Sequence, residues 1–172
     1  MIVGEEIHTR EGDLVAVFLE RAVPRGLSVA DSIAAVREQG GLVGLPHPFD
    51  RTRGSLLRGD AGAALAGMVD WVESHNARVM LGDGNERAAT YAREHDLPGI
   101  AVSDAHSVIE VGVAYTTLTG DPSTADGLRA ALAGASIVPG RASFYVRLIT
   151  PVAKLVHRLR GERRPVASAD RT

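Results

Sequence analysis

The chain carries the stretch Ile100-Ala101-Val102-Ser103-Asp104-Ala105-His106, and the fold class follows from how this stretch begins and ends. Ile100–Val102 is a short apolar run behind Pro98-Gly99, which predicts a buried strand. Asp104 and His106 are two residues apart, so both point to one side if the extended path continues. A carboxylate and an imidazole at a strand end form half of a metal site. The alternative is that Asp104 caps a turn and His106 is an ordinary surface residue.

Two other segments place ligand-type side chains beside apolar runs. Gly4-Glu5-Glu6-Ile7 follows the apolar start of the chain, and Pro46-His47-Pro48-Phe49-Asp50 follows the run at 41–45. Strand ends that deliver Glu, His and Asp-x-His are the layout of an α/β barrel active site, which lies at the carboxyl ends of parallel strands. The sequence therefore predicts an α/β fold whose site is assembled from segments far apart in the chain.

At these segments the chain resembles the PHP domains, the polymerase and histidinol phosphatase family. The matching pieces are Gly-Glu-Glu-Ile at 4–7, the run from Gly40 to Asp50, Asn-Ala-Arg at 76–78 and Ser-Asp-Ala-His at 103–106. The resemblance extends over about residues 1–140. It implies a distorted (β/α) barrel with metal ions at the carboxyl ends of its strands, and hydrolysis of a phosphoester by metal-activated water.

The resemblance also assigns candidate metal ligands. Glu6 matches the family's glutamate after Gly-x, and His47 matches its His-Pro ligand. Asp104 and His106 match the closing Asp-x-His. Asp13 stands where many relatives have a histidine, and its carboxylate could still bind a metal.

Other polar residues have weaker or different roles under this resemblance. Glu5 would point away from Glu6 on a strand. Glu73 and His75, two residues apart, are weaker ligand candidates. The arginines expected to hold substrate phosphate by bidentate hydrogen bonds are Arg51, Arg53 and Arg78, with an ordinary surface position as the alternative for each.

The chain departs from the family pattern at its front. PHP domains open with a His-x-His strand and further ligands, whereas Met1 stands just before the Gly-Glu-Glu piece. By barrel proportions the difference is about two βα units. We therefore expect an incomplete PHP-type barrel, one bound ion in place of a two-metal clamp, and little phosphatase turnover by this chain alone.

Three interpretations of the function stay open. The chain is a metal-dependent phosphoesterase whose assigned start is too late, a short paralogue that acts as a metal- or phosphate-binding module, or a fragment that gains missing ligands from a partner chain or a homo-oligomer. The expected substrate is a small phosphorylated molecule. The DNA upstream of Met1 separates the first interpretation from the others, and gel filtration with metal analysis separates the second from the third.

Composition limits the cofactor and the partners. The 172 residues correspond to one domain and contain no cysteine, so a metal must be held by histidine and carboxylate side chains, which suits Mn, Zn or Fe. The net charge of −2 gives no general attraction for nucleic acid or anionic membrane. No apolar run approaches the ~20 residues that span a bilayer. Met1 is not followed by a signal-peptide pattern, so a cytoplasmic location is expected.

The remaining elements are predicted from apolar spacing, turn residues and helix caps. Residues 1–7 and Val15–Leu19 are expected to pair as a hairpin or as adjacent strands. Ser28 is expected to cap a helix over 29–39 that leads into a strand at 42–46. Further along, we expect an alanine-rich helix ending near Met68, a strand at Val69–Val72, a helix capped by Asp83 or Asn85 and ending at Glu94, a strand at Val111–Leu118 and a helix from Ser123 to Gly134.

The C-terminal part differs in composition and sets the expected domain boundaries. A partial PHP-like domain is predicted over 1–140, and a basic amphipathic helix region over 141–164. The helix begins at Thr150-Pro151 and places Val152, Leu155, Val156 and Leu159 at helical spacing. It either packs on the domain or contacts a partner or a membrane surface. Residues 165–172 are expected to form a disordered tail.

Overall fold

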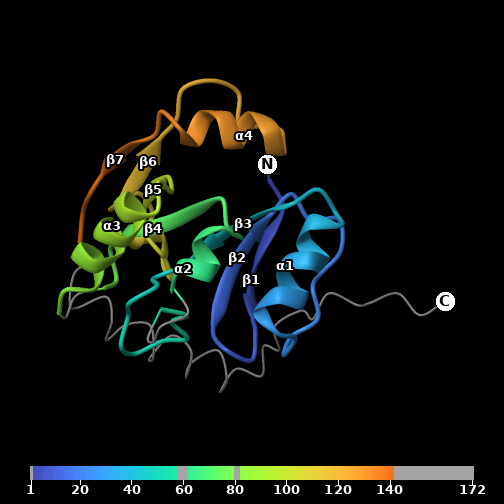
Figure 1. Ribbon diagram of the computed structural model, residues 1–172. Coiled ribbons are helices and arrows are strands. Elements are labelled where there is room, and N and C mark those ends of the chain that lie inside the picture. Colours follow the sequence, from blue (N-terminus) through green and yellow to red (C-terminus); the bar gives the residue numbers. More distant parts are fainter. Residues whose placement is uncertain (1, 58–61, 80–81, 142–172) are drawn as a thin grey trace, which may run out of the picture.

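The computed structural model describes residues 2–57, 62–79 and 82–141, and a mixed five-stranded sheet is their central element (Figure 1). In spatial order the strands are β1 (Gly4–His8), β2 (Asp13–Val17), β3 (Leu42–Leu45), β4 (Trp71–Asn76) and β5 (Gly99–Val102). β2 is antiparallel to both β1 and β3, whereas β3, β4 and β5 are parallel. The carboxyl ends of β1, β3, β4 and β5 therefore lie at one end of the sheet, together with the amino end of β2.

The predicted hairpin is present as β1 and β2, but β2 is displaced from the range expected from sequence. It covers Asp13–Val17 instead of Val15–Leu19, because Asp13 pairs directly with His8 across the hairpin. The strand ends before Phe18, whose φ of 63° interrupts the extended path. Asp13 consequently belongs to a strand and not to the turn, and the pairing register fixes its position.

The first helix follows its local signals closely. In α1 (Val29–Arg37), the Ser28 side chain accepts a hydrogen bond from the Asp31 backbone N–H and donates one to the Asp31 carboxylate at 2.6 Å. Gly40, with φ of 73°, follows the helix, which ends two residues earlier than the predicted 29–39. Ile33 and Val36 are buried, so the helix packs its apolar face on the sheet side of the molecule.

The parallel strands alternate with helices, as the βαβ rhythm predicts. Two helices, α2 (Gly62–Ala66) and α3 (Gly84–Glu94), precede β4 and β5 respectively, and α3 packs against β4. The predicted range of β4 begins and ends too early in the sequence: the strand covers Trp71–Asn76 and not Val69–Val72. Apolar content ends at Val72, but the strand continues through four polar residues, most of them buried at the carboxyl end of the sheet.

A smaller antiparallel pair follows the main sheet. It comprises β6 (Tyr115–Thr117) and β7 (Ser136–Val138), with α4 (Ala125–Leu132) between them, and it lies beside β5 (Figure 1). The strand predicted at Val111–Leu118 is therefore shorter, because a 3-10 turn at Val108–Glu110 occupies the preceding segment. Thr124, and not Ser123, caps α4 by accepting from the Gly127 N–H.

The architecture is the predicted α/β class, with an open arrangement. Among the described residues the sheet does not close into a barrel, since β1 and β5 are the outer strands of the five. The main core lies between the sheet and the helices and includes Ile7, Leu14, Val36, Leu45 and Val72. The predicted C-terminal helix and tail lie outside the described residues, which end at Arg141. No helix in the described ranges has both the length and the apolarity to cross a bilayer.

Candidate metal centre

The hairpin gathers polar side chains on one of its faces. Glu6 and His8 are two residues apart on β1, so they point to the same side, and Asp13 lies opposite His8 on β2. His8 Nδ1 donates a hydrogen bond to Asp13 Oδ1 at 2.7 Å. Ile7 and Leu14 point to the other side, into the main core. The alternation of β1 and its register with β2 thus bring two carboxylates to the carboxyl end of the sheet.

Glu5 follows the same alternation and lies away from this group. Its Oε1 accepts a hydrogen bond from the Val23 backbone N–H at 2.7 Å. Its carboxylate holds the segment that precedes α1, which is a structural contact on the opposite side of the strand from Glu6.

His47 approaches the hairpin from the segment that follows β3. Its side chain is only 3% exposed. Its backbone has a φ of 29°, in a region that residues other than glycine seldom adopt. Its Nε2 is 3.4 Å from Glu6 Oε1. Its backbone N–H donates to Glu73 Oε2 at 2.9 Å, so a buried carboxylate on β4 holds this turn in place.

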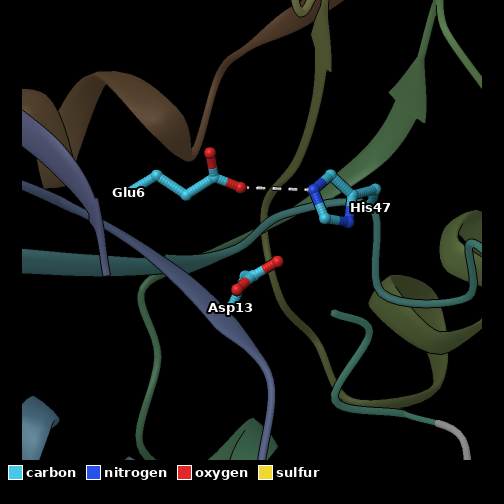
Figure 2. Close-up of side chains that lie close together, drawn as sticks. All are labelled: Glu6, Asp13 and His47. Atoms are coloured by element: carbon cyan, nitrogen blue, oxygen red, sulfur yellow. Dashed lines mark ion pairs between the residues drawn. The ribbon is translucent and has the colours of Figure 1, made fainter. Parts of the chain in front are cut away.

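The side chains of Glu6, Asp13 and His47 converge from three separate segments (Figure 2). One ligand atom from each lies within 4.8 Å of those of the other two. Ligands that share an ion sit ~2.0–2.2 Å from it, so they must lie within about twice that distance of one another. The separation is therefore close to what a shared cation requires, and we call these three residues the triad.

The loop beside Asp13 is shaped to approach it closely. Asp13 N–H donates to the Gly54 carbonyl at 2.7 Å. A Cβ at Gly54 would come within 2.5 Å of Asp13 Oδ2, so any larger residue there would displace the carboxylate. The absence of a side chain at Gly54 leaves the space that the Asp13 carboxylate occupies.

The donor set of the triad fits a divalent ion. Two carboxylates and one imidazole suit Mn, Zn or Fe without selecting among them. His47 Nδ1 is buried and has no hydrogen-bond partner among the described residues, although buried ring nitrogens are normally satisfied. This ring is therefore incompletely satisfied by protein groups alone.

The charges of the Glu6–His47 pair also suit a bound cation. The hydrogen bond to His47 lowers the pKa of Glu6. Burial alone would lower the pKa of His47, but the hydrogen bond to Glu6 and the negative charges of Glu73 and Glu6 outweigh it and raise that pKa. The pair thus favours an ionised carboxylate and a protonated ring, and a metal ion would take the place of the proton.

Asp104 and His106 lie on the segment after β5, outside the triad. The strand ends at Val102, and Asp104 has a φ of 49°, so the extended path does not continue through the pair. His106 is exposed, and its Nδ1 donates to the Asp104 carbonyl at 2.9 Å. The Asp104 carboxylate accepts from Asn76 Nδ2 at 3.2 Å and is paired with Arg53 Nη1. Their role as ligands stays a prediction.

The predicted phosphate-binding arginines have different environments. Arg53 contacts Asp104 and also Asp50, whose Oδ2 is 3.1 Å from Arg53 Nε. Arg51 is exposed, with its Nη2 4.0 Å from Asp83 Oδ1. Arg78 is buried, and its Nη1 donates to Glu110 Oε1 at 2.9 Å. Their roles in binding phosphate stay predictions, and in this structure each guanidinium faces a carboxylate.

Sequence reasoning passed over three residues at this end of the sheet. His8 contacts Asp13, and Glu110 holds both Arg78 and the backbone N–H of His106. Asn76 bonds to both Glu73 and Asp104. His8 had an available signal, since it stands two residues after Glu6 at the end of the strand expected over residues 1–7, and Asn76 stands in the Asn-Ala-Arg piece of the resemblance. Of the weaker candidates, Glu73 is buried beside His47, whereas His75 Nε2 donates to the Gly140 carbonyl at 2.8 Å.

Comparisons with known proteins agree with the fold. Residues 82–136 match the family described as PHP-associated. A two-domain protein from Bacteroides vulgatus, described as containing a predicted PHP-like metal-dependent phosphoesterase, has a similar fold with a TM-score of 0.64 at 20% identity, over 81% of this chain and 44% of that one. The chain is thus similar to PHP-like proteins in its fold and, over residues 82–136, in its sequence. PsfC from Pseudomonas syringae resembles this chain with a TM-score of 0.65 at 16% identity, over 89% of this chain and 65% of PsfC.

Curated relatives match this chain over only part of their own length. MJ0417 of Methanocaldococcus jannaschii, an uncharacterized protein, is 38% identical over 117 residues, which is 66% of this chain and 49% of the relative. MJ1587 of the same organism, also uncharacterized, is 43% identical over 49 residues, or 28% of this chain and 29% of the relative. The chain thus spans about half the length of the first relative and less than a third of the second.

Proposed function

We propose that this chain is a metal-dependent phosphoesterase that hydrolyses a small phosphate ester, with Glu6, Asp13 and His47 holding a divalent ion. The single observation that carries the proposal is the convergence of these three side chains within 4.8 Å, with a buried imidazole nitrogen of His47 lacking a hydrogen-bond partner among the described residues. A bound ion supplies a Lewis acid for the phosphoryl oxygen and lowers the pKa of a bound water.

The protein residues contribute binding and access. His47 is buried and fixed through its backbone, so it provides a rigid ligand. The Glu6 side chain is 48% exposed, which leaves the centre open to a small molecule from solvent. Arg53 pairs with Asp104 on the segment after β5 and with Asp50 on the segment after His47, so its guanidinium lies at the same end of the sheet as the triad. Arg53 is accordingly our candidate for contacting substrate phosphate.

Asp104 and His106 enter this proposal as secondary ligands of the same centre, weaker than the triad. Their segment follows β5, at the end of the sheet that also carries His47, and Asn76 links Asp104 to the group around Glu73. Arg53 would exchange its contact with Asp104 for substrate phosphate. The observation that supports their participation is this shared position and the match to Asp-x-His.

The experiment that tests the proposal measures metal binding before activity. Purified chain is stripped with a chelator, titrated with Mn²⁺ by calorimetry, and assayed with p-nitrophenyl phosphate with and without the ion. We expect saturable binding that the isosteric changes Glu6→Gln and Asp13→Asn weaken. His95→Gln is the matched control, because His95 lies at the end of α3 and contacts Tyr91 in a tilted arrangement with ring centroids 4.4 Å apart. Equal binding by all variants would contradict the triad as the metal site.

A second candidate function is that of a metal- or phosphate-binding module, or of a fragment that completes its centre with a partner chain. The open sheet favours this function, because the described residues gather three ligands in the triad and do not close into a barrel. Binding of Mn²⁺ without turnover would favour the module. Light scattering that detects an oligomer with metal-dependent turnover would favour a shared centre.

A further inference from the structure

Glu73 and Asn76, near the end of β4, are buried polar residues that the proposed metal centre leaves without a role. Their exposed fractions are 8% and 1%. Neither belongs to the triad, and a buried polar side chain lowers stability unless it is hydrogen bonded. Their partners show what these two residues connect.

An irregularity in β4 places them on the same side of the strand. The pairing of β4 with β5 shifts between Glu73 and His75, so that Ser74 is an additional residue in the ladder. In a regular strand, residues three positions apart point to opposite faces, and a bulge corrects this by one residue. Asn76 Nδ2 can therefore donate to Glu73 Oε2 at 2.9 Å.

The amide of Asn76 uses all of its principal hydrogen-bonding groups. Nδ2 donates to Glu73 Oε2 and, at 3.2 Å, to Asp104 Oδ2, while Oδ1 accepts from the Arg78 backbone N–H at 2.9 Å. The opposite amide orientation would direct a carbonyl oxygen at two carboxylates, so the chemistry of the partners determines which atom is nitrogen. Asn76 is thereby a fixed bridge between carboxylates on two segments.

The backbone of Asn76 is also held. Asn85, in the first turn of α3, accepts from the Asn76 N–H through Oδ1 at 3.0 Å and donates through Nδ2 to the Asn76 carbonyl at 3.2 Å. These two bonds fix the end of β4 to the start of α3. The side chain of Asn76 consequently projects from an anchored backbone.

Glu73 connects Asn76 to the backbone of His47. Its Oε2 accepts from the His47 N–H at 2.9 Å as well as from Asn76. The backbone of His47 has a φ of 29°, a conformation that costs energy and persists only where the surroundings fix it. The bond to Glu73 is one such constraint, and it continues through Asn76 to Asp104.

We propose that Asn76 and Glu73 are positioning residues that set His47 and Asp104 at a fixed separation. The β4 bulge at Ser74 is the structural feature that allows the pair to act together. The consequence for ion binding rests on the proposed metal centre. Removing Asn76 or Glu73 should lower metal affinity about 10–100-fold, the usual cost of losing a residue that hydrogen-bonds to a metal ligand.

The first test needs no metal. The hydrogen exchange rate of the His47 backbone amide is measured by NMR in metal-free Asn76→Ala. We expect at least about tenfold faster exchange of this amide than in the unsubstituted chain, because its acceptor is no longer held. Thr116→Val is the matched control: it removes two bonds of a partly buried side chain to the Ala101 backbone, at 2.8 and 2.9 Å, without touching a carboxylate. Unchanged His47 exchange in folded Asn76→Ala would overturn the proposal.

The second test compares Mn²⁺ affinities among variants of matched melting temperature. Asn76→Ala and Glu73→Ala should bind about 10–100-fold more weakly, and Glu73→Gln should retain more affinity than Glu73→Ala because its carbonyl oxygen can accept both bonds. Thr116→Val should lower stability and leave affinity unchanged. Equal affinity in Asn76→Ala would overturn the functional part. If the unsubstituted chain binds no Mn²⁺, the proposed function fails, and the exchange measurement alone decides the positioning role.

Discussion

The triad and the segment after β5 contain the same types of residue but differ in how their charges are compensated. In the triad, two carboxylates face one buried imidazole, and His47 Nδ1 has no hydrogen-bond partner among the described residues. In the segment 103–110, which we call the β5 loop, Asp104 faces Arg53 and Glu110 faces Arg78. The first region is incompletely satisfied by protein groups, whereas the second is largely neutralised by arginines.

This difference indicates that residue type alone does not identify a ligand. Glu110 is 1% exposed and accepts from Ser107 Oγ, the His106 N–H and Arg78 Nη1, so its carboxylate holds the β5 loop together. A carboxylate with this many donors is a structural group. By contrast, Glu6 and Asp13 are partly exposed, and their main polar contacts are histidines. The predictions below test whether the two regions are as distinct as their contacts indicate.

The largest expected effect is on stability, in the β5 loop. Arg78→Ala removes one partner of a buried ion pair and leaves Glu110 uncompensated, which should lower the free energy of unfolding by about 3–5 kcal/mol in a urea titration. Arg93→Ala is the control, because among the described residues Arg93 bonds to its own helix alone and is exposed, so its loss should cost under about 0.5 kcal/mol. A loss below about 1 kcal/mol for Arg78→Ala would show that the pair does not organise the loop.

The next effect is on metal affinity and contrasts a histidine from each region. His47→Ala should weaken Mn²⁺ binding at least about 100-fold. This loss exceeds the usual cost of removing a residue that only hydrogen-bonds to a metal ligand. His106→Ala should cost less than about tenfold, because that ring is exposed and its Nδ1 bonds to the Asp104 carbonyl. Calorimetric titration of both variants checks this. Equal losses would show that His106 holds the ion as strongly as His47 and would remove the contrast between the regions.

A smaller effect concerns the pH dependence of the triad. The pKa of His47 is raised above its usual 6.5, so proton and ion compete for the ring as the pH falls through that raised value. Mn²⁺ affinity should therefore decrease by up to about tenfold per pH unit below it. Titrations between pH 8 and pH 6, in two buffers of different ionisation enthalpy, measure both the affinity and the proton released. Affinity that stays constant over this range would exclude His47 as a ligand that must lose a proton.

The smallest expected effect is the acid sensitivity of the β5 loop. Burial alone would raise the pKa of Glu110, but hydrogen bonds from Ser107 and the His106 N–H, and the charge of Arg78, lower it below 4.5. A lowered pKa in the folded state contributes stability that is complete above the unfolded value and is lost as the pH falls through the folded one. Melting temperatures between pH 7 and pH 3 should decline less steeply in Glu110→Gln than in the unsubstituted chain. Parallel curves would show that other acids govern the decline.

The sequence by itself determined the elements that depend on neighbouring residues. The Ser28–Asp31 cap and Gly40 predicted α1 to within two residues, and the apolar run behind Pro98-Gly99 predicted β5. The hairpin and the PHP resemblance were also available from local patterns, as was the position of His47 after a strand. These signals are short-range: a cap, a period or a turn is complete within a few residues.

Only the tertiary structure decided which polar groups meet. Asp13 joins Glu6 and His47 because the register pairs it with His8, and Arg78 pairs with Glu110 across 32 positions of sequence. The polar end of β4 remains a strand because its side chains find buried partners, and a bulge turns Glu73 and Asn76 to one side. Buried charges and amides are stable only beside specific partners brought from distant segments, so their arrangement follows from three-dimensional packing and not from local composition.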